Sequence, residues 1–529
     1  MFEPFDEENQ VGFGDFDFNL PDNLKEQLNK GWPGKFYEHV FTEIDESKFA
    51  AMYDSQYGRP NFPVKILVSL EIMKHQFDLS DKELLERFHF DARYIKALGL
   101  NEVGQLTLGE RTLYDFRERL LDYIKETGHD PLTEVFDDLV ANFIEVADLD
   151  TDIQRMDSTM VRANIKHLSR IQLMRKVLDN LVKELPEHKR NQIHKNILKT
   201  LDDDGFRNYL NNFDKEEIRD SLLGKLNSLK LLFKNDKEIN ETKAYQQLCR
   251  LVKEQSIETT KQLKAKDDKD VKSSSLQNPY DEDATYRKKG SKAQKGYSVN
   301  ISETSNPDNP AQMITDVSLD ANINSDVNFL NNRLADINNK TDLEKLIVDG
   351  AYYGSDSKKT AQINKTELIL TTLTGQDPKY STAEFKLKHK EGIVACPMGK
   401  SPVKDKYLNS SDTYAAWFEK GDCRNCTYQD KCPVTEQKKN MTVRFKKKRY
   451  DRDRLRDKHS TNEYQLLKRL RAAVEGTFSA LKRSQGLDQF KVCGKLKVRC
   501  TTMYKALGYN IKQLVRILNG DIRTCLSTR

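Results

Sequence analysis

The chain has 529 residues, of which 37% are hydrophobic and 32% charged, and its formal net charge is +5. This length allows two or more domains, and no apolar run approaches the roughly 18 to 20 residues that a membrane-spanning helix needs. The N-terminal segment MFEPFDEENQ is acidic and lacks an apolar core, which excludes a secretory signal peptide and predicts a cytoplasmic protein with no membrane partner.

Charge is distributed unevenly along the chain. Residues 1–60 carry 13 acidic residues against 5 lysines and arginines, whereas residues 441–500 carry 18 lysines and arginines against 6 acidic residues. A segment with such an excess of positive charge repels itself unless a polyanion neutralises it, so nucleic acid is the predicted partner. A solvated helical face is the alternative interpretation.

Residues 23–147 are predicted to be mostly helical. The clearest segments are 63–88 and 109–128, and Ser80 precedes the apolar periodicity of Lys82–Phe88 as an N-cap residue would. Periodicity alone assigns no function to this region, and a small helical bundle is the simplest interpretation.

The pattern changes at residues 148–165, DLDTDIQRMDSTMVRANI, where alternating side chains predict a strand. From about 167 to 263 the helical period returns in two apolar stripes, which predicts an insertion of packed helices. The polar run 264–283 is predicted to be a loop or mobile linker.

Strand signals then return in order. Segments 295–304 and 311–320 flank a turn sequence, 324–339 has the pattern of a helix capped by Ser325 or Asn324, and 343–354 and 366–373 are apolar strands. This order predicts an α+β or α/β fold in which helices cover a mixed sheet.

Three acidic residues lie on these predicted elements. Asp349 ends the apolar strand LIVD, and α/β sheets present ligand-binding groups at this end of a strand. Asp157 lies in the first predicted strand, and Glu475 lies on a late helix. Three carboxylates from separate elements can hold two Mg²⁺ ions, which activate a water or a 3′-hydroxyl and stabilise the leaving oxygen. Taken singly, each acid has a structural alternative, a turn cap or an ion pair.

Glu475 belongs to RLRAAVEGTFSALKR (469–483), which has the pattern of one amphipathic helix. At about 100° per residue, Arg471, Glu475 and Lys482 fall beside one another at the edge of its apolar stripe. The two cations either form a surface ion pair with the glutamate or contact substrate phosphates.

Three segments resemble the active-site blocks of bacterial insertion-sequence transposases of the DDE type: DSTMVRANI (157–165), LIVDGAYYG (346–354) and KRLRAAVEGTFSALKR (468–483). The family signature around its third acid is Tyr-x2-Arg-x3-Glu-x6-Lys, which Arg471, Glu475 and Lys482 match, while Lys468 replaces the tyrosine. The resemblance implies an RNase H-like core, Asp157, Asp349 and Glu475 as catalytic ligands of two Mg²⁺ (or Mn²⁺) ions, and Lys468 among the phosphate contacts.

Residues about 30–120 resemble the InsH-type N-terminal transposase domain, which is implicated in binding DNA ends. The implied activity is cleavage at element ends and transfer of the 3′-hydroxyl into target DNA, by a homodimer or larger assembly bound to terminal inverted repeats in a bacterial, nucleoid-associated setting. The alternatives are a DNA-binding protein from an inactive element and a structure-specific nuclease. The expected domains are an N-terminal DNA-binding domain (1–147), a catalytic core (148–165, 284–375 and 445–520), a helical insertion with its linker (166–283) and a cysteine-rich insertion (376–444).

Four cysteines have the spacing of a metal site. Cys423 and Cys426 form a C-x2-C pair, and Cys396 and Cys432 complete a set of four thiolates for a tetrahedral, structural Zn²⁺. Related transposases carry similar cysteine clusters, and four reduced structural thiols are the alternative.

Two basic strips and one tryptophan are further candidates for DNA contact. The strip 445–459 leads toward Glu475, and the strip 286–297 follows the linker, with a solvated loop as its alternative. Trp417 fits core packing, or stacking on a flipped base as in some related transposases. The residues of the first strip taken as phosphate contacts are Lys446, Lys447, Lys448 and Arg449.

Overall fold

The computed structural model describes residues 1–5, 20–54, 57–258, 263–372, 380–459 and 461–520. The chain divides into two compact units, one formed by Met1–Leu343 with Glu475–Arg529 and the other by Glu344–Val474. No helix in the described part of the chain is long and apolar enough to cross a bilayer.

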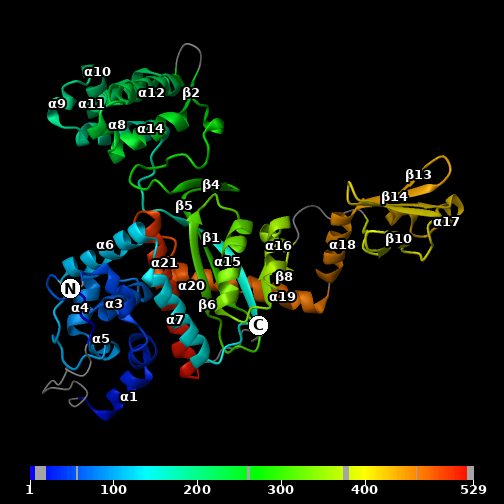
Figure 1. Cartoon of the computed structure of the whole chain (residues 1–529), viewed down its shortest axis with the longest axis horizontal. Coiled ribbons are helices and arrows are strands. Elements are labelled where there is room, and N and C mark those ends of the chain that lie inside the picture. The colour runs from blue at the N-terminus through cyan, green and yellow to red at the C-terminus, as the bar shows by residue number, and fades with distance from the viewer. Residues whose placement is uncertain (6–19, 55–56, 259–262, 373–379, 460, 521–529) are drawn as a thin grey trace. The chain divides into compact units, whose positions relative to one another are not determined.

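The first unit begins with a group of helices, as predicted for residues 23–147 (Figure 1). The helical segment 63–88 forms two helices, because the chain turns at Asp78, whose φ is +53°. Ser80 caps the second helix and exchanges hydrogen bonds with Glu83, which confirms the predicted cap. The helices are α1 (Asp22–Lys30), α2 (Trp32–Phe36), α3 (Val64–Gln76), α4 (Asp81–Phe90), α5 (Ala92–Ala97), α6 (Glu110–Thr127) and α7 (Pro131–Val146), with a π-helical turn at Tyr37–Phe41 and a 3-10 helix at Glu46–Met52.

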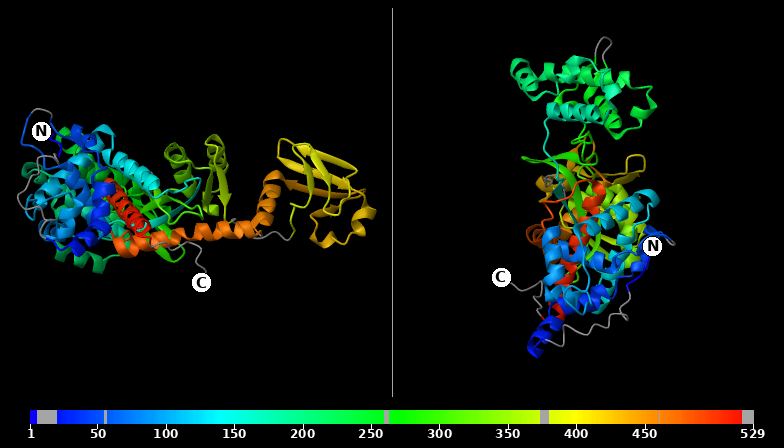
Figure 2. Two further views of the ribbon diagram at one scale, coloured as in Figure 1. Left: turned by 90° about the horizontal axis from the view of Figure 1, so that it is seen from below. Right: turned by 90° about the vertical axis from the view of Figure 1, so that its left-hand side faces the viewer.

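A long C-terminal helix, α21 (Lys495–Leu518), packs against α3 and α7 (Figures 1 and 2). The close approach depends on Gly508, since a Cβ there would lie 2.8 Å from the Cα of Gln76 on α3. Two residues further along, Asn510 makes two hydrogen bonds of 2.8 Å to the backbone of Ile314, which fixes α21 against a sheet strand.

The sheet of this unit is antiparallel and consists of β1 (Ile153–Arg162), β4 (Thr285–Lys289), β5 (Lys292–Thr304) and β6 (Ile314–Ala321). β5 pairs with β1 along one edge, and with β4 and then β6 along the other. The basic strip 286–297 is therefore a β-hairpin rather than a solvated loop. Helix α15 (Asp326–Lys340) follows β6 and has Ser325 as its N-cap, as predicted.

The predicted helical insertion has a hydrophobic core of its own, in which both apolar stripes are buried. The loop that follows is anchored rather than mobile, because the buried Asn278 donates to the carbonyl of Lys166 at 2.9 Å and the buried Asp281 accepts from Tyr297. Its elements are α8 (Arg170–Glu184), α9 (Glu187–Arg190), α10 (Lys195–Leu198), α11 (Asp203–Asn212), α12 (Lys215–Leu232), α13 (Lys237–Asn240), α14 (Lys243–Gln255), β2 (Ser256–Glu258) and β3 (Leu263–Ala265), with a 3-10 helix at Asp268–Asp270.

The second unit begins with β7 (Lys345–Val348), which pairs in parallel with β8 (Glu367–Leu370), and α16 (Ser355–Ile363) lies between them in the chain. A small β-rich part follows, with a two-stranded sheet and a four-stranded antiparallel sheet in the order β11-β12-β14-β13. Its elements are β9 (Lys386–Lys388), β10 (Gly392–Ala395), β11 (Lys404–Leu408), β12 (Thr413–Phe418), α17 (Lys420–Arg424), β13 (Val434–Glu436), β14 (Met441–Lys446), α18 (Lys447–His459) and α19 (Asn462–Ala472), with 3-10 helices at Gly350–Tyr352 and Gln429–Lys431.

The helix expected over 469–483 is interrupted for one residue. It forms the end of α19 and most of α20 (Val474–Gln485), with Ala473 between them. The boundary between the two units falls directly after Val474, so Arg471 and Glu475 belong to different units.

Gly508→Ala tests the packing of α21. We expect a loss of about 1 to 3 kcal/mol of unfolding free energy, because the new methyl group meets the backbone of α3. Gly224→Ala on α12 is the matched control: nothing lies within 4 Å of its Cβ position, and helix propensity should stabilise it by about 0.5 to 1 kcal/mol. Urea denaturation measures both, and two shifts of the same sign and size would contradict the packing argument.

Candidate active site

Asp157 lies in the middle of β1 with its side chain half-buried. Because side chains alternate along a strand, Arg155 and Thr159 project from the same face as Asp157. Both of these neighbours are tied to helix α20, by separate interactions.

The first connection is a buried ion pair. Arg155 lies directly opposite Glu303 in the register of β1 and β5, and its Nε is 2.7 Å from Glu303 Oε1, with both side chains almost inaccessible. Thr477 of α20 donates its hydroxyl to the same carboxylate, at 2.8 Å from Oε2 and 3.1 Å from Oε1. Burial raises the pKa of Glu303, and Arg155 and Thr477 oppose the rise. Arg155 and Thr477 therefore both stabilise the negative charge of the buried Glu303 carboxylate.

The second connection is made by Lys482, whose Nζ donates to Thr159 Oγ1 at 2.6 Å. Burial lowers the pKa of Lys482, while the negative charges of Asp488 and Asp157 raise it. Helix α20 thus lies along the face of β1 that carries Asp157, and the negative charge of Asp157 interacts with Lys482.

Glu475 is exposed near the start of α20. It precedes Lys482 by seven residues, which is about two helical turns, so both residues lie on nearly the same side of the helix. The first unit therefore positions two of the predicted acids, Asp157 and Glu475, on elements that pack together.

Asp349 belongs to the second unit and follows β7 directly. Its Oδ1 accepts the backbone N–H of Ala351 at 2.8 Å, so it caps the turn, and its Oδ2 is 3.4 Å from Nη2 of Arg471. The next residue is glycine because a Cβ at Gly350 would lie 2.7 Å from the carbonyl oxygen of Thr372. Arg471, predicted as a phosphate contact, is thus paired with the second predicted acid.

The predicted basic contacts differ in their surroundings. Lys446 and Lys448 are exposed, whereas Lys447 lies 3.4 Å from Asp451 and Arg449 lies 3.7 Å from the buried Asp453. Arg449 also lies over the ring of Tyr380, 4.6 Å from its centroid. Lys468 is half-buried on α19.

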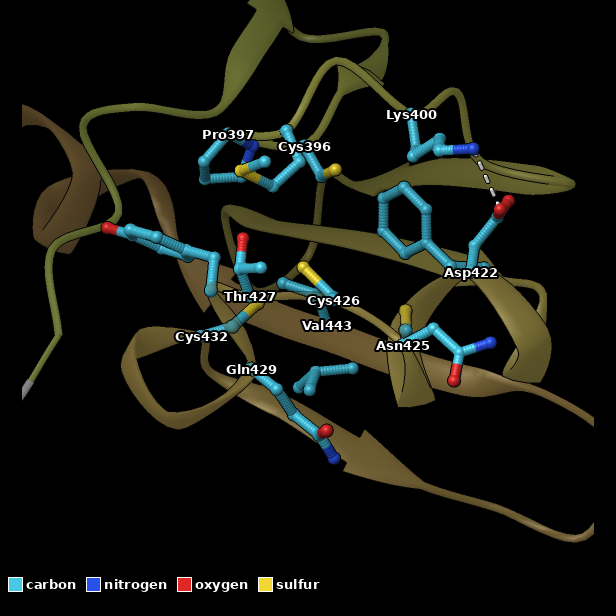
Figure 3. Close-up of a pocket in the computed structure, with 15 residues that line it drawn as sticks. Cys396, Pro397, Lys400, Asp422, Asn425, Cys426, Thr427, Gln429, Cys432 and Val443 are labelled. Atoms are coloured by element: carbon cyan, nitrogen blue, oxygen red, sulfur yellow. Dashed lines mark hydrogen bonds and ion pairs between the residues drawn. The ribbon is translucent and has the colours of Figure 1, made fainter.

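The four predicted cysteine ligands line one cavity of about 250 Å³ (Figure 3). Burial raises the pKa of the Cys432 thiol to about 11, and the other three thiols add to the rise. The cavity lies beside an apolar cluster that includes Phe418 and Val443. In the described part of the chain, no three His, Cys, Asp or Glu side chains are arranged closely enough to hold a metal ion.

Sequence reasoning did not find Glu303 or Thr477. Neither carries a motif, and their importance follows from the register that places Glu303 opposite Arg155. It also missed Asp326 at the first position of α15, which accepts a hydrogen bond of 2.5 Å from the Ser158 hydroxyl. Its signal in the sequence was an acidic residue in the first turn of the helix predicted over 324–339.

Two family models match the chain. Residues 395–515 match a "Transposase DDE domain" and residues 23–119 match a "Transposase domain (DUF772)". No curated protein matches. A solved structure of the piggyBac transposase synaptic complex with hairpin DNA is 7% identical to this chain. The match covers 95% of this chain and 80% of the other chain, but its TM-score is 0.28, so no argument rests on it.

The two matches, in the expected order along the chain, define a DNA transposase. The match to a transposase DDE domain indicates an enzyme that cleaves DNA and transfers its strands, as the resemblance of the three sequence segments implied. The comparisons do not favour the two alternatives, an inactive DNA-binding protein and a nuclease.

A double-mutant cycle tests the buried ion pair. Arg155→Met and Glu303→Leu should each cost about 3 to 5 kcal/mol of unfolding free energy, because each leaves a buried charge without its partner, whereas the double variant should recover most of the loss. Urea denaturation gives the coupling energy. The control is Lys125→Met in the exposed pair with Asp122, which should change stability by less than about 1 kcal/mol. Additive losses from Arg155 and Glu303 would contradict the account.

Proposed function

We propose that the chain mobilises a bacterial insertion sequence, and that Asp157, Asp349 and Glu475 together form its catalytic site. The observation that supports this most is the packing of α20 along the Asp157 face of β1, through Thr477 and Lys482. In this proposal the enzyme nicks DNA at the ends of the element and joins each freed 3′-hydroxyl to target DNA.

The proposed core is an RNase H-like mixed sheet. In chain order the structure has three antiparallel strands (β1, β5 and β6), a helix (α15), and a parallel strand pair (β7 and β8) with a helix between them. The proposal requires Asp349, which follows β7, to bind the same metal ions as Asp157 and Glu475.

The donor set suits divalent cations such as Mg²⁺ or Mn²⁺, because these hard ions prefer carboxylate oxygens. Bound there, two such ions would supply the activation of the attacking water or hydroxyl and the stabilisation of the leaving oxygen. In the structure both carboxylate oxygens of Asp349 already accept hydrogen bonds. In the proposed site Asp349 would bind a metal ion alongside these partners or in exchange for Arg471, whose guanidinium could then contact a DNA phosphate.

Lys482 has a matching role in the first unit. Its ammonium group lies between Thr159 and the charge of Asp157, in a site where burial disfavours its charge. A phosphate placed beside Asp157 would restore a negative partner to Lys482 and position the scissile bond. We propose Lys468, Lys446 and Lys448 as outer backbone contacts, and the N-terminal helices as the part that holds the terminal inverted repeats.

The cysteine cavity is proposed to hold one structural Zn²⁺. Burial and the neighbouring thiols raise the pKa of Cys423 and Cys432, and a cation bound in the cavity would reverse this cost by favouring the thiolates. The residues would be Cys396, Cys423, Cys426 and Cys432, with no position left open for chemistry.

Cutting two element ends would require a dimer or a larger assembly.

Asp157→Asn, Asp349→Asn and Glu475→Gln test the catalytic assignment. Each should lower both cleavage and strand transfer by about a thousandfold, because a lost metal ligand removes several kcal/mol of transition-state stabilisation. The assay uses full-length protein, Mg²⁺, target plasmid and labelled DNA carrying the repeats that flank the coding sequence. Asp356→Asn, an exposed acid on α16, is the control and should act like wild type. Unchanged products from any one site variant would remove that residue from the site.

Metal analysis tests the zinc proposal. Full-length protein purified without chelator should contain about one zinc per chain, and Cys423→Ser should lose it, because a tetrahedral site needs all four ligands. Cys249→Ala, in the helical insertion, should keep the zinc. Protein without stoichiometric zinc, or zinc retained by Cys423→Ser, would overturn this proposal.

A further inference from the structure

The four-stranded sheet of the second unit has one face that the proposed catalytic site does not use. Residues directly opposite one another in an antiparallel pair project from the same face. Trp417 on β12 lies opposite Lys404 on β11, and Ala415 lies opposite both Lys406 on β11 and Arg444 on β14. Three cations from the two strands that flank β12 therefore share one face, and all three are exposed.

The other face of the same sheet is the apolar one. Tyr407, Tyr414, Phe418 and Phe445 point into the core of this unit, next to the cysteine cavity. Asp405 also belongs to this side, since its carboxylate lies where a Cβ of Gly392 on β10 would be. The outward positions of the four described strands include no acidic residue: they are Lys404, Lys406, Leu408, Thr413, Ala415, Trp417, Thr435, Thr442, Arg444 and Lys446.

Trp417 is thus not a core residue, because it is half-exposed on the basic face between two of the cations. Lys404 Nζ lies 5.7 Å from its ring centroid and Arg444 Cζ lies 5.8 Å from it. Contacts of this kind attract a cation to the face of an aromatic ring. The indole therefore restricts the side chains of Lys404 and Arg444 before a ligand binds, so they lose less conformational entropy on binding.

The cations have no compensating charge. No ion pair involving Lys404, Lys406 or Arg444 occurs in the described part of the chain, whereas Lys388 on β9 of the same unit pairs with Glu391. Strand geometry places Lys404 and Lys406 about 7 Å apart along β11, and the β11 and β14 rows about 10 Å apart. Three exposed cations at these spacings on two strands fit a repeating polyanion better than a single small anion.

We propose that this face of the β11–β14 sheet binds the phosphate backbone of duplex DNA through Lys404, Lys406 and Arg444, with Trp417 positioning two of them. The proposal relies on the proposed function only in that the chain acts on DNA. It adds a surface outside the catalytic residues, which meets the strip 446–449 only at Lys446. Binding by phosphate contacts alone is independent of base sequence and strongly dependent on salt.

The test compares two triple variants of the full-length protein with equal change in charge. Lys404→Ala, Lys406→Ala and Arg444→Ala are combined in one, and Lys386→Ala, Lys388→Ala and Lys390→Ala, exposed on or beside β9, in the other. The probe is a labelled 30-base-pair duplex of arbitrary sequence, in buffer without added Mg²⁺ or Mn²⁺, so that catalysis plays no part.

Losing three phosphate contacts should weaken binding by about tenfold or more near 0.1 M salt and reduce the slope of log K against log salt by about 2 to 3. The control variant should stay within about twofold of wild type. Equal binding by the two variants would overturn the proposal, while leaving the catalytic assignment untouched, since that rests on cleavage and strand transfer.

A fluorescence measurement separates duplex backbone from unpaired bases. The chain has two tryptophans, so Trp32→Phe leaves Trp417 as the reporter. The proposal expects the duplex to bind at least as tightly as a single strand of the same length, with only a small change in Trp417 emission. Tighter binding of the single strand with strong quenching would show base stacking on the indole and overturn the duplex assignment.

Discussion

The arrangement of the first unit depends on one buried ion pair, between Arg155 on β1 and Glu303 on β5. Two charges removed from water are tolerated only where each has its partner and its remaining hydrogen-bonding capacity is used. Thr477 supplies the further hydrogen bond to Glu303, and it does so from α20. The desolvated carboxylate therefore connects two strands and a helix, and it fixes the elements that carry Asp157 and Glu475.

The second unit has the opposite organisation, because its candidate catalytic acid is satisfied locally. Asp349 caps the turn after β7 and pairs with Arg471. Each of its oxygens accepts one hydrogen bond and has a second lone pair, so in the proposed site Asp349 would bind a metal ion in addition to these partners or in place of Arg471. In the same unit the two faces of the β11–β14 sheet differ in chemistry. Thiols and aromatic side chains lie on one face, and Lys404, Lys406 and Arg444 lie on the other.

Local signals in the sequence predicted much of this structure. The apolar run LIVD predicted β7 and its terminal acid, Ser80 and Ser325 predicted helix starts, and two apolar stripes predicted the separate core of the helical insertion. Long-range pairing was not predictable, because the register that places Glu303 opposite Arg155 joins residues 148 positions apart. For residues 264–283 the sequence left open a loop or a mobile linker, because a polar run does not show which side chains become buried and hydrogen-bonded, as Asn278 and Asp281 are. The placement of Asp157, Asp349 and Glu475 in a single site stays a prediction.

The central claim is that these three carboxylates hold the same metal ions. Mn²⁺ binding followed by electron paramagnetic resonance, on full-length protein bound to duplex DNA, tests it most directly. Wild type should bind two Mn²⁺ per chain, and Asp157→Asn, Asp349→Asn or Glu475→Gln should each weaken that binding by about a hundredfold or more, since carboxylates supply most of the ligand charge. Unchanged Mn²⁺ binding in Asp349→Asn, with loss in the other two variants, would show that the two units do not build one site.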